Sequence, residues 1–133
     1  SQNEKGFFLM VESAFPDKGG HGNQPEISVL GTVQADWIVR SAVAFAQSRG
    51  DTLVLVTADH ETGGLSCTMS HTPPNRLTLR YATTSHTDNP VALFAFGPGD
   101  YLFSGLIDNT DIAVAISRLW NLTFPPPGDP VAK

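Results

Sequence analysis

Residues 52–60 read TLVLVTADH, a run of apolar and β-branched side chains that ends in a carboxylate and an imidazole. Such a run predicts a strand over residues 52–57 that is buried on both faces. From about Glu26 to Arg49 the apolar residues recur at the spacing of one helical face, which predicts a helix. Gly50 stands where the C-cap of that helix belongs.

A second apolar run lies ahead of this helix. Residues 7–11 read FFLMV and predict another strand buried on both faces. Pro and Gly residues interrupt any regular pattern over residues 13–25, which are therefore expected to form a loop. Strand, helix and strand predict a βαβ unit with a parallel sheet. In such a unit the loops that begin at Glu12 and Asp59 lie at the same edge of the sheet.

Farther along the chain, shorter patterns complete an α/β interpretation. Residues 77–83 alternate between apolar and polar and predict a half-exposed strand, and residues 91–96 predict a buried one. A last helix is expected to begin with Asn109 or Thr110 as its cap. The Pro-rich residues at about 123–133 are predicted to form a tail without regular structure.

Length and composition set limits on what this chain can be. Its 133 residues, 41% of them hydrophobic, are enough for one compact domain, predicted at 1–133. The net charge of −5 and the absence of a Lys/Arg cluster argue against nucleic acid as a partner. The apolar runs are far shorter than the roughly 20 residues of a transmembrane helix, so no transmembrane segment is expected. No signal peptide is recognisable in the chain, whose start resembles a cut end, with any such peptide upstream.

Carboxylates and imidazoles gather in three segments, each of which follows a predicted strand. These candidate metal ligands are Glu12, Asp17, His21, Asp59, His60 and His86. Asp and His ligands suit Zn²⁺, and a purely carboxylate position suits Mg²⁺. Taken one at a time, each has an ordinary interpretation as a solvated or loop residue, or at Asp59 as the N-cap of a short turn. Only the whole set is specific.

Two further residues with ligand chemistry have ordinary interpretations. His71 precedes a Pro-rich turn and has no carboxylate near it in sequence, so we expect a plain loop histidine. Cys67 is the single cysteine, which excludes an intramolecular disulfide and a Cys-rich zinc module, and it is expected to be a small buried apolar residue.

The spacing of the candidate ligands resembles a known family. Residues 12–21, ESAFPDKGGH, have the alkaline phosphatase pattern of Glu, four residues, Asp, three residues and His. Residues 52–64 resemble the second signature of the family, an apolar strand that runs into Thr-Ala-Asp-His. Residues 85–87, with the strand and helix that follow, are similar to its closing segment. The resemblance covers residues 4–122 and is typical of the bacterial type.

This resemblance implies a fold, a chemistry and a set of roles. The fold would be part of the doubly wound α/β/α sandwich of the alkaline phosphatase type, as its carboxy-terminal, ligand-bearing portion. Asp17, His21 and His86 would bind a first zinc, Asp59 and His60 a second, and Glu12 a magnesium ion. Two such zincs clamp the attacking and leaving oxygens while a phosphate monoester is hydrolysed through a phosphoserine. The compartment implied is periplasmic or extracellular.

The sequence also departs from the family pattern. The nucleophilic serine of the family lies in an Asp-Ser-Ala motif, which does not occur here, and neither Ser13 nor Ser85 has that context. We therefore expect this chain alone to be inactive and only partly loaded with metal. Its apolar strands are expected to promote self-association. Two alternatives remain open: another phosphotransferase of the same superfamily (a phosphomutase or phosphodiesterase), or a non-catalytic zinc-binding module.

Overall fold

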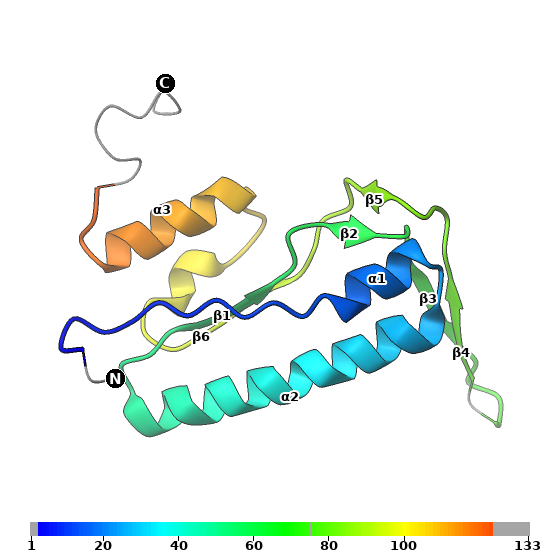
Figure 1. Cartoon of the computed structure of the whole chain (residues 1–133), viewed down its shortest axis with the longest axis horizontal. Coiled ribbons are helices and arrows are strands. Elements are labelled where there is room, and N and C mark those ends of the chain that lie inside the picture. Colours follow the sequence, from blue (N-terminus) through cyan, green and yellow to red (C-terminus); the bar gives the residue numbers. More distant parts are fainter. Residues whose placement is uncertain (1–2, 75, 124–133) are drawn as a thin grey trace. The chain divides into compact units, whose positions relative to one another are not determined.

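The structure is a computed structural model that describes residues 3–74 and 76–123 (Figure 1). Its elements follow one another in the order α1 (Phe15–His21), α2 (Pro25–Arg49), β1 (Val54–Thr57), β2 (Glu61–Thr62), β3 (Ser66–Met69), β4 (Leu77–Arg80), β5 (His86–Thr87), β6 (Leu93–Phe96), the 3-10 helix η1 (Asp100–Phe103) and α3 (Asn109–Leu119). They form two compact units. The first unit comprises Ser1–Trp37 and Glu61–Thr87, and the second comprises Ile38–His60 and Asp88–Lys133.

In the first unit, α1 packs closely against the beginning of α2 because small residues line the contact. A Cβ added at Gly19 would overlap Ser28, and one added at Gly31 would lie only 2.8 Å from the nitrogen of Pro16. The hydroxyl of Tyr81 donates a 2.9 Å hydrogen bond to the Ser28 hydroxyl. In the same unit, β2 pairs antiparallel with β5, and β3 pairs antiparallel with β4.

The second unit holds the buried apolar side chains of the described residues. Strand β1 pairs antiparallel with β6, and Val54 lies opposite Phe96. Among the described residues the buried apolar core consists of Ala46, Phe103 and Ala115, which are 2%, 4% and 7% exposed. All three belong to this unit. None of the described helices has both the length and the apolar character that crossing a bilayer requires.

Both long helices confirm their predictions. The first, α2, spans Pro25–Arg49, and Gly50 follows it with a φ of 71° and a 2.8 Å hydrogen bond from its N–H to the Ala46 carbonyl. For α3 the predicted cap is wrong, because neither Asn109 nor Thr110 is the N-cap. Asp108 is the N-cap, because its side chain accepts from the backbone of Thr110 while the Asp111 side chain accepts from the Asp108 N–H.

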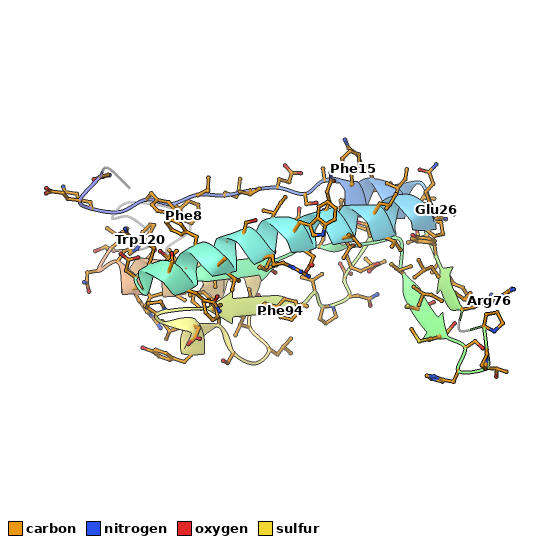
Figure 2. The ribbon with its side chains drawn as sticks, turned by 90° about the horizontal axis from the view of Figure 1, so that it is seen from below. Phe8, Phe15, Glu26, Arg76, Phe94 and Trp120 are labelled. Atoms are coloured by element: carbon orange, nitrogen blue, oxygen red, sulfur yellow. The ribbon has the colours of Figure 1, made fainter. Side chains whose placement is uncertain are left out.

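The predicted strand at residues 7–11 is wrong. This segment belongs to none of the sheets in the described residues (Figure 1), and Leu9 and Met10 are 71% and 79% exposed. Figure 2 shows Phe8 on the same segment, where its side chain is 64% exposed. An apolar run fits a strand only if a neighbour supplies the hydrogen-bond ladder, and β1 pairs with β6 instead. The predicted parallel βαβ unit is accordingly absent from the described residues.

The predicted loop at residues 13–25 is also wrong, because α1 occupies Phe15–His21. Pro16 lies in the first turn of α1, where a proline fits because the N–H it lacks would have no helical partner. The helix includes Gly19 and Gly20, both buried, and ends at His21, with Gly22 as its C-cap. Glycines that would weaken an isolated helix are tolerated here because they permit the close packing described above.

The remaining strands are shorter and less buried than predicted. Residues 52–57 and 91–96 contribute only β1 and β6, and β6 alternates in burial, with Phe94 65% exposed (Figure 2). The half-exposed strand predicted at residues 77–83 is β4, which is mostly exposed. Strands β2, β3 and β5 were not predicted. Of the predicted tail, residues 124–133 lie outside the described residues.

Candidate metal centre

The helix α1 brings two of the predicted ligands together. Asp17 and His21 are four residues apart on this helix and therefore share one face. The Nε2 atom of His21 lies 3.4 Å from Oδ1 of Asp17, and both side chains are a little over two-fifths exposed. The pair is thus preformed and reachable from solvent.

The third predicted ligand comes from β5, which is far away in sequence. His86 lies directly opposite Thr62 in the β2–β5 pair, and α1 packs on β2. This arrangement places Nε2 of His86 at 3.1 Å from Nε2 of His21 and at 3.7 Å from Oδ1 of Asp17. Helix and hairpin therefore direct two imidazoles and one carboxylate at a common point.

The spacing of these three atoms matches the chemistry of zinc. Ligands that lie 2.0–2.1 Å from a tetrahedral ion are about 3.4 Å from one another. The three observed distances, 3.1, 3.4 and 3.7 Å, bracket that value. Within the part of the chain that the structure describes, Asp17, His21 and His86 form the group that could hold a metal ion.

The tautomer of His21 supports the same interpretation. Its Nδ1 atom lies 2.6 Å from the backbone carbonyl of Thr84, which can only accept a hydrogen bond. The proton is therefore assigned to Nδ1, and Nε2 keeps its lone pair directed at His86 and Asp17. Metal-binding histidines commonly have this arrangement, in which one ring nitrogen donates to a carbonyl and the other binds the ion.

The side chain of Asp17 has a further partner on β2. The hydroxyl of Thr62 donates a 2.6 Å hydrogen bond to Oδ1 of Asp17, the same oxygen that faces the two imidazoles. Thr62 and the helix meet closely because the residue before His21 is a glycine. A Cβ added at Gly20 would lie 2.8 Å from the Thr62 carbonyl oxygen.

A carboxylate next to Thr62 holds the surrounding backbone. Glu61 accepts hydrogen bonds from the N–H groups of Gly64 at 3.0 Å and Leu65 at 2.9 Å. The same carboxylate accepts a hydrogen bond from the hydroxyl of Thr87, which follows His86 on β5. Sequence reasoning missed Glu61 and Thr62, because their residue types carry no sign of a role until the pairing of β2 with β5 is known.

Other residues singled out from the sequence lie elsewhere. Asp59 and His60 follow β1 in the second unit, where Nε2 of His60 is 3.2 Å from Oδ2 of Asp59. Glu12 is exposed and precedes α1. His71 lies exposed between β3 and β4, in agreement with its ordinary interpretation. Cys67 is exposed on β3, so the prediction that it is buried is wrong.

Comparisons with known proteins show which family the chain resembles. A family model described as alkaline phosphatase matches residues 1–81. Alkaline phosphatase H of Pseudomonas aeruginosa is 36% identical over 136 residues, which cover 90% of this chain and 29% of that protein. The alkaline phosphatase of Escherichia coli is 34% identical over 128 residues, which cover 84% of this chain and 27% of that protein.

Solved structures give the same result. The alkaline phosphatase from the Antarctic bacterium TAB5 matches with a TM-score of 0.80 and 32% identity, over 88% of this chain and 36% of that one. A mutant of the same protein with Mg bound in its M3 site matches with a TM-score of 0.77 and 31% identity. The chain thus spans roughly a third or less of the length of these proteins.

Proposed function

Because the chain belongs to the alkaline phosphatase family, we propose that it supplies part of the metal centre of a phosphomonoester hydrolase. The likeness to solved structures confirms the predicted fold class, part of the α/β sandwich of the alkaline phosphatase type. The activity belongs to a protein of the length of its relatives, of which this chain spans about a third or less.

The observation that carries the proposal is the convergence of two imidazole nitrogens and one carboxylate oxygen. We assign Asp17, His21 and His86 to one zinc ion, since their mutual distances of 3.1–3.7 Å suit tetrahedral coordination. Three protein ligands leave one tetrahedral position for substrate, as in catalytic sites, whereas a structural site fills all four. When bound, zinc supplies Lewis-acid stabilisation of charge on phosphoryl oxygens. The donor set thus favours a phosphotransfer enzyme over a zinc module that only ties loops together.

Each residue has its own part in this site. Asp17 contributes negative charge, which partly neutralises the ion, and its Oδ1 is oriented by the Thr62 hydroxyl. His21 binds through Nε2 because its Nδ1 proton is engaged by Thr84. His86 would be the third ligand and is contributed by β5.

The other ligands of the family pattern complete the proposal. Asp59 and His60 would bind a second zinc, and Glu12 would bind magnesium. For the zinc pair the support is the Thr-Ala-Asp-His motif and the 3.2 Å approach of the two side chains. For magnesium it is the motif position of Glu12 and the ion bound in the related TAB5 mutant. Two protein ligands hold an ion less firmly than three, so partial occupancy is expected in this chain.

The whole protein would act on phosphate monoesters through a phosphoserine and function in the periplasm or outside the cell. Support for the substrate class comes from the names of the bacterial alkaline phosphatases to which the chain is similar, and the compartment is proposed from the family resemblance alone. Since the sequence contains no Asp-Ser-Ala, the nucleophile would come from residues beyond these 133.

Metal titration tests the proposal directly. Isothermal titration of the metal-stripped chain with Zn²⁺ should show one tight site, and His86→Ala should remove it. His71→Ala is the matched control, because His71 is also an exposed histidine but lies outside the convergent group. Tight binding that survives His86→Ala would refute the assignment.

A further inference from the structure

We infer that Thr62 and Glu61, the two residues of β2, are positioning residues that set the geometry of the Asp17–His21–His86 site. The inference rests on the proposed function, because it assumes that these three side chains bind metal. Neither Thr62 nor Glu61 is assigned as a ligand. Both act through the residues that they hold.

Thr62 contacts the site in two ways. Through its side chain it donates a 2.6 Å hydrogen bond to Oδ1 of Asp17, a length typical of a hydroxyl bound to an ionised carboxylate. Through its backbone it pairs with His86 across the β2–β5 ladder. One residue therefore determines where a ligand from the helix and a ligand from the hairpin lie relative to each other.

The hydrogen bond from Thr62 also selects the orientation of Asp17. A carboxylate on a helix surface has several rotamers, and its side-chain torsions cost entropy when they are fixed. With the hydroxyl in place, Oδ1 stays within 3.4 Å of Nε2 of His21 before any metal arrives. This preorganisation should raise the affinity for metal, because the entropy lost in fixing the Asp17 side chain is already lost when the chain folds.

Glu61 fixes the other side of the site by holding the turn that follows β2. Its carboxylate joins the N–H groups of Gly64 and Leu65 to the hydroxyl of Thr87. Within this turn the N–H of Gly63 donates a 3.0 Å hydrogen bond to the carbonyl of Ser85, the residue before His86. The backbone on both sides of His86 is thus tied to β2.

Two substitutions of Thr62 separate positioning from packing. Thr62→Val keeps the shape of the side chain and removes the hydroxyl, whereas Thr62→Ser keeps the hydroxyl and removes the methyl group. That methyl group faces α1, where a Cβ added at Gly20 would lie 2.9 Å from it. If Thr62 positions Asp17, the Thr62→Ser chain should bind zinc as the unsubstituted chain does, and the Thr62→Val chain should bind it more weakly. If Thr62 acts only by packing, Thr62→Val should keep the zinc affinity and Thr62→Ser should lose it.

The experiment is a competition titration of the metal-stripped 133-residue chain with Zn²⁺, followed by the visible spectrum of bound Co²⁺. We expect Thr62→Val to lose about 10- to 100-fold in zinc affinity, as is usual when a partner of a metal ligand is removed. Its Co²⁺ absorption should also weaken or shift, because the ion no longer has the same ligand geometry. Thr62→Ser should retain both properties, and thermal unfolding of the metal-free chains shows whether each variant is folded.

The outcomes separate this inference from the proposed function. In one outcome the unsubstituted chain binds zinc, the His21→Ala chain does not, and the Thr62→Val chain binds zinc as tightly as the unsubstituted chain. The positioning role of Thr62 is then wrong, but the metal site is supported. If the chain binds no zinc, or His21→Ala binds it unchanged, both ideas are wrong. Should Thr62→Val not fold, Thr87→Val tests the Glu61 contact. It should weaken zinc binding, and unchanged affinity would overturn the inference.

Discussion

Substitution of Gly20 by Ala is the most direct test of whether the packing of α1 sets the geometry of the candidate metal centre. The added Cβ would lie 2.8 Å from the Thr62 carbonyl oxygen and 2.9 Å from its methyl carbon. Ordinary van der Waals contact begins at 3.4 Å, so α1 and β2 must separate by about 0.6 Å. The nearest obstacle is backbone, which cannot turn aside as a flexible side chain could.

This separation has two opposite energetic consequences. Overpacking typically costs about 1–3 kcal/mol, while alanine is a better helix former than glycine by about 1 kcal/mol. We therefore expect a net loss of stability of about 0–2 kcal/mol, measurable by urea denaturation of the metal-free chain. The effect on metal affinity should be larger, because Asp17 and His21 move away from both Thr62 and His86. A tenfold or greater loss of zinc affinity is the expected order of magnitude.

Gly22→Ala provides the matched control. An added Cβ there meets the side chain of Gln24 at 3.0 Å, and that side chain can rotate away. Gly22 also has an ordinary φ of −85°, so alanine is not strained at this position. The control should bind zinc as the unsubstituted chain does. A folded Gly20→Ala chain that also binds zinc unchanged would show that the contact between α1 and β2 does not set the geometry of the site.

Three further predictions concern assembly, activity and acid sensitivity. Light scattering should show concentration-dependent self-association, which Leu9→Lys with Met10→Lys should reduce. Leu106→Lys, at a leucine that is 90% exposed outside the apolar run of residues 7–11, should not reduce it, and a monomer at every concentration would contradict the prediction. Hydrolysis of p-nitrophenyl phosphate by this chain should stay at background with added zinc, and turnover of about 1 per second or faster would reveal an unrecognised nucleophile. Hydrogen bonds from the backbone and hydroxyl of Thr110 lower the pKa of Asp108. The stability that Asp108 gives to α3 should therefore be complete above the pKa of a free Asp. It should be lost as the pH falls through the lowered pKa of Asp108 in the folded chain. Chemical denaturation of the unsubstituted chain and Asp108→Ala should therefore differ at neutral pH and converge in acid, and a difference that persists in acid would rule out this origin.

The sequence was sufficient to predict those elements whose structure depends on a local residue pattern. A long apolar period predicts α2, and Asn109 or Thr110 before such a period indicates where α3 begins, although the exact cap depends on which side chain completes the capping box. The ligand trio could be proposed because motif spacing, taken with the family resemblance, specifies Asp17, His21 and His86 without knowledge of their geometry. Their convergence then follows from the packing of α1 on β2 and the pairing of β2 with β5.

What could not be predicted depends on partners distant in sequence. The apolar run at residues 7–11 has the composition of a strand, but composition does not reveal whether a neighbouring strand is available. Strands β2 and β5 are each two residues long, too short for any periodicity to appear. The glycines of α1 suggest a loop when considered alone, and the close approach of Ser28 and Thr62, which explains why glycine suits these helical positions, is visible only in the structure.

The shortness of α1 has a consequence for how the chain responds to metal. A helix of seven residues with two internal glycines is unstable in isolation. Helix nucleation is costly, and each glycine destabilises the helix by about 1 kcal/mol relative to alanine. Two of the proposed zinc ligands lie on this helix, so zinc binds only when the helix is ordered. By mass action the ion must then favour the ordered form, and we expect the amide protons of residues 15–21 to exchange more slowly with solvent as zinc is added. Zinc would thereby reduce the local opening of a helix that already forms in its absence.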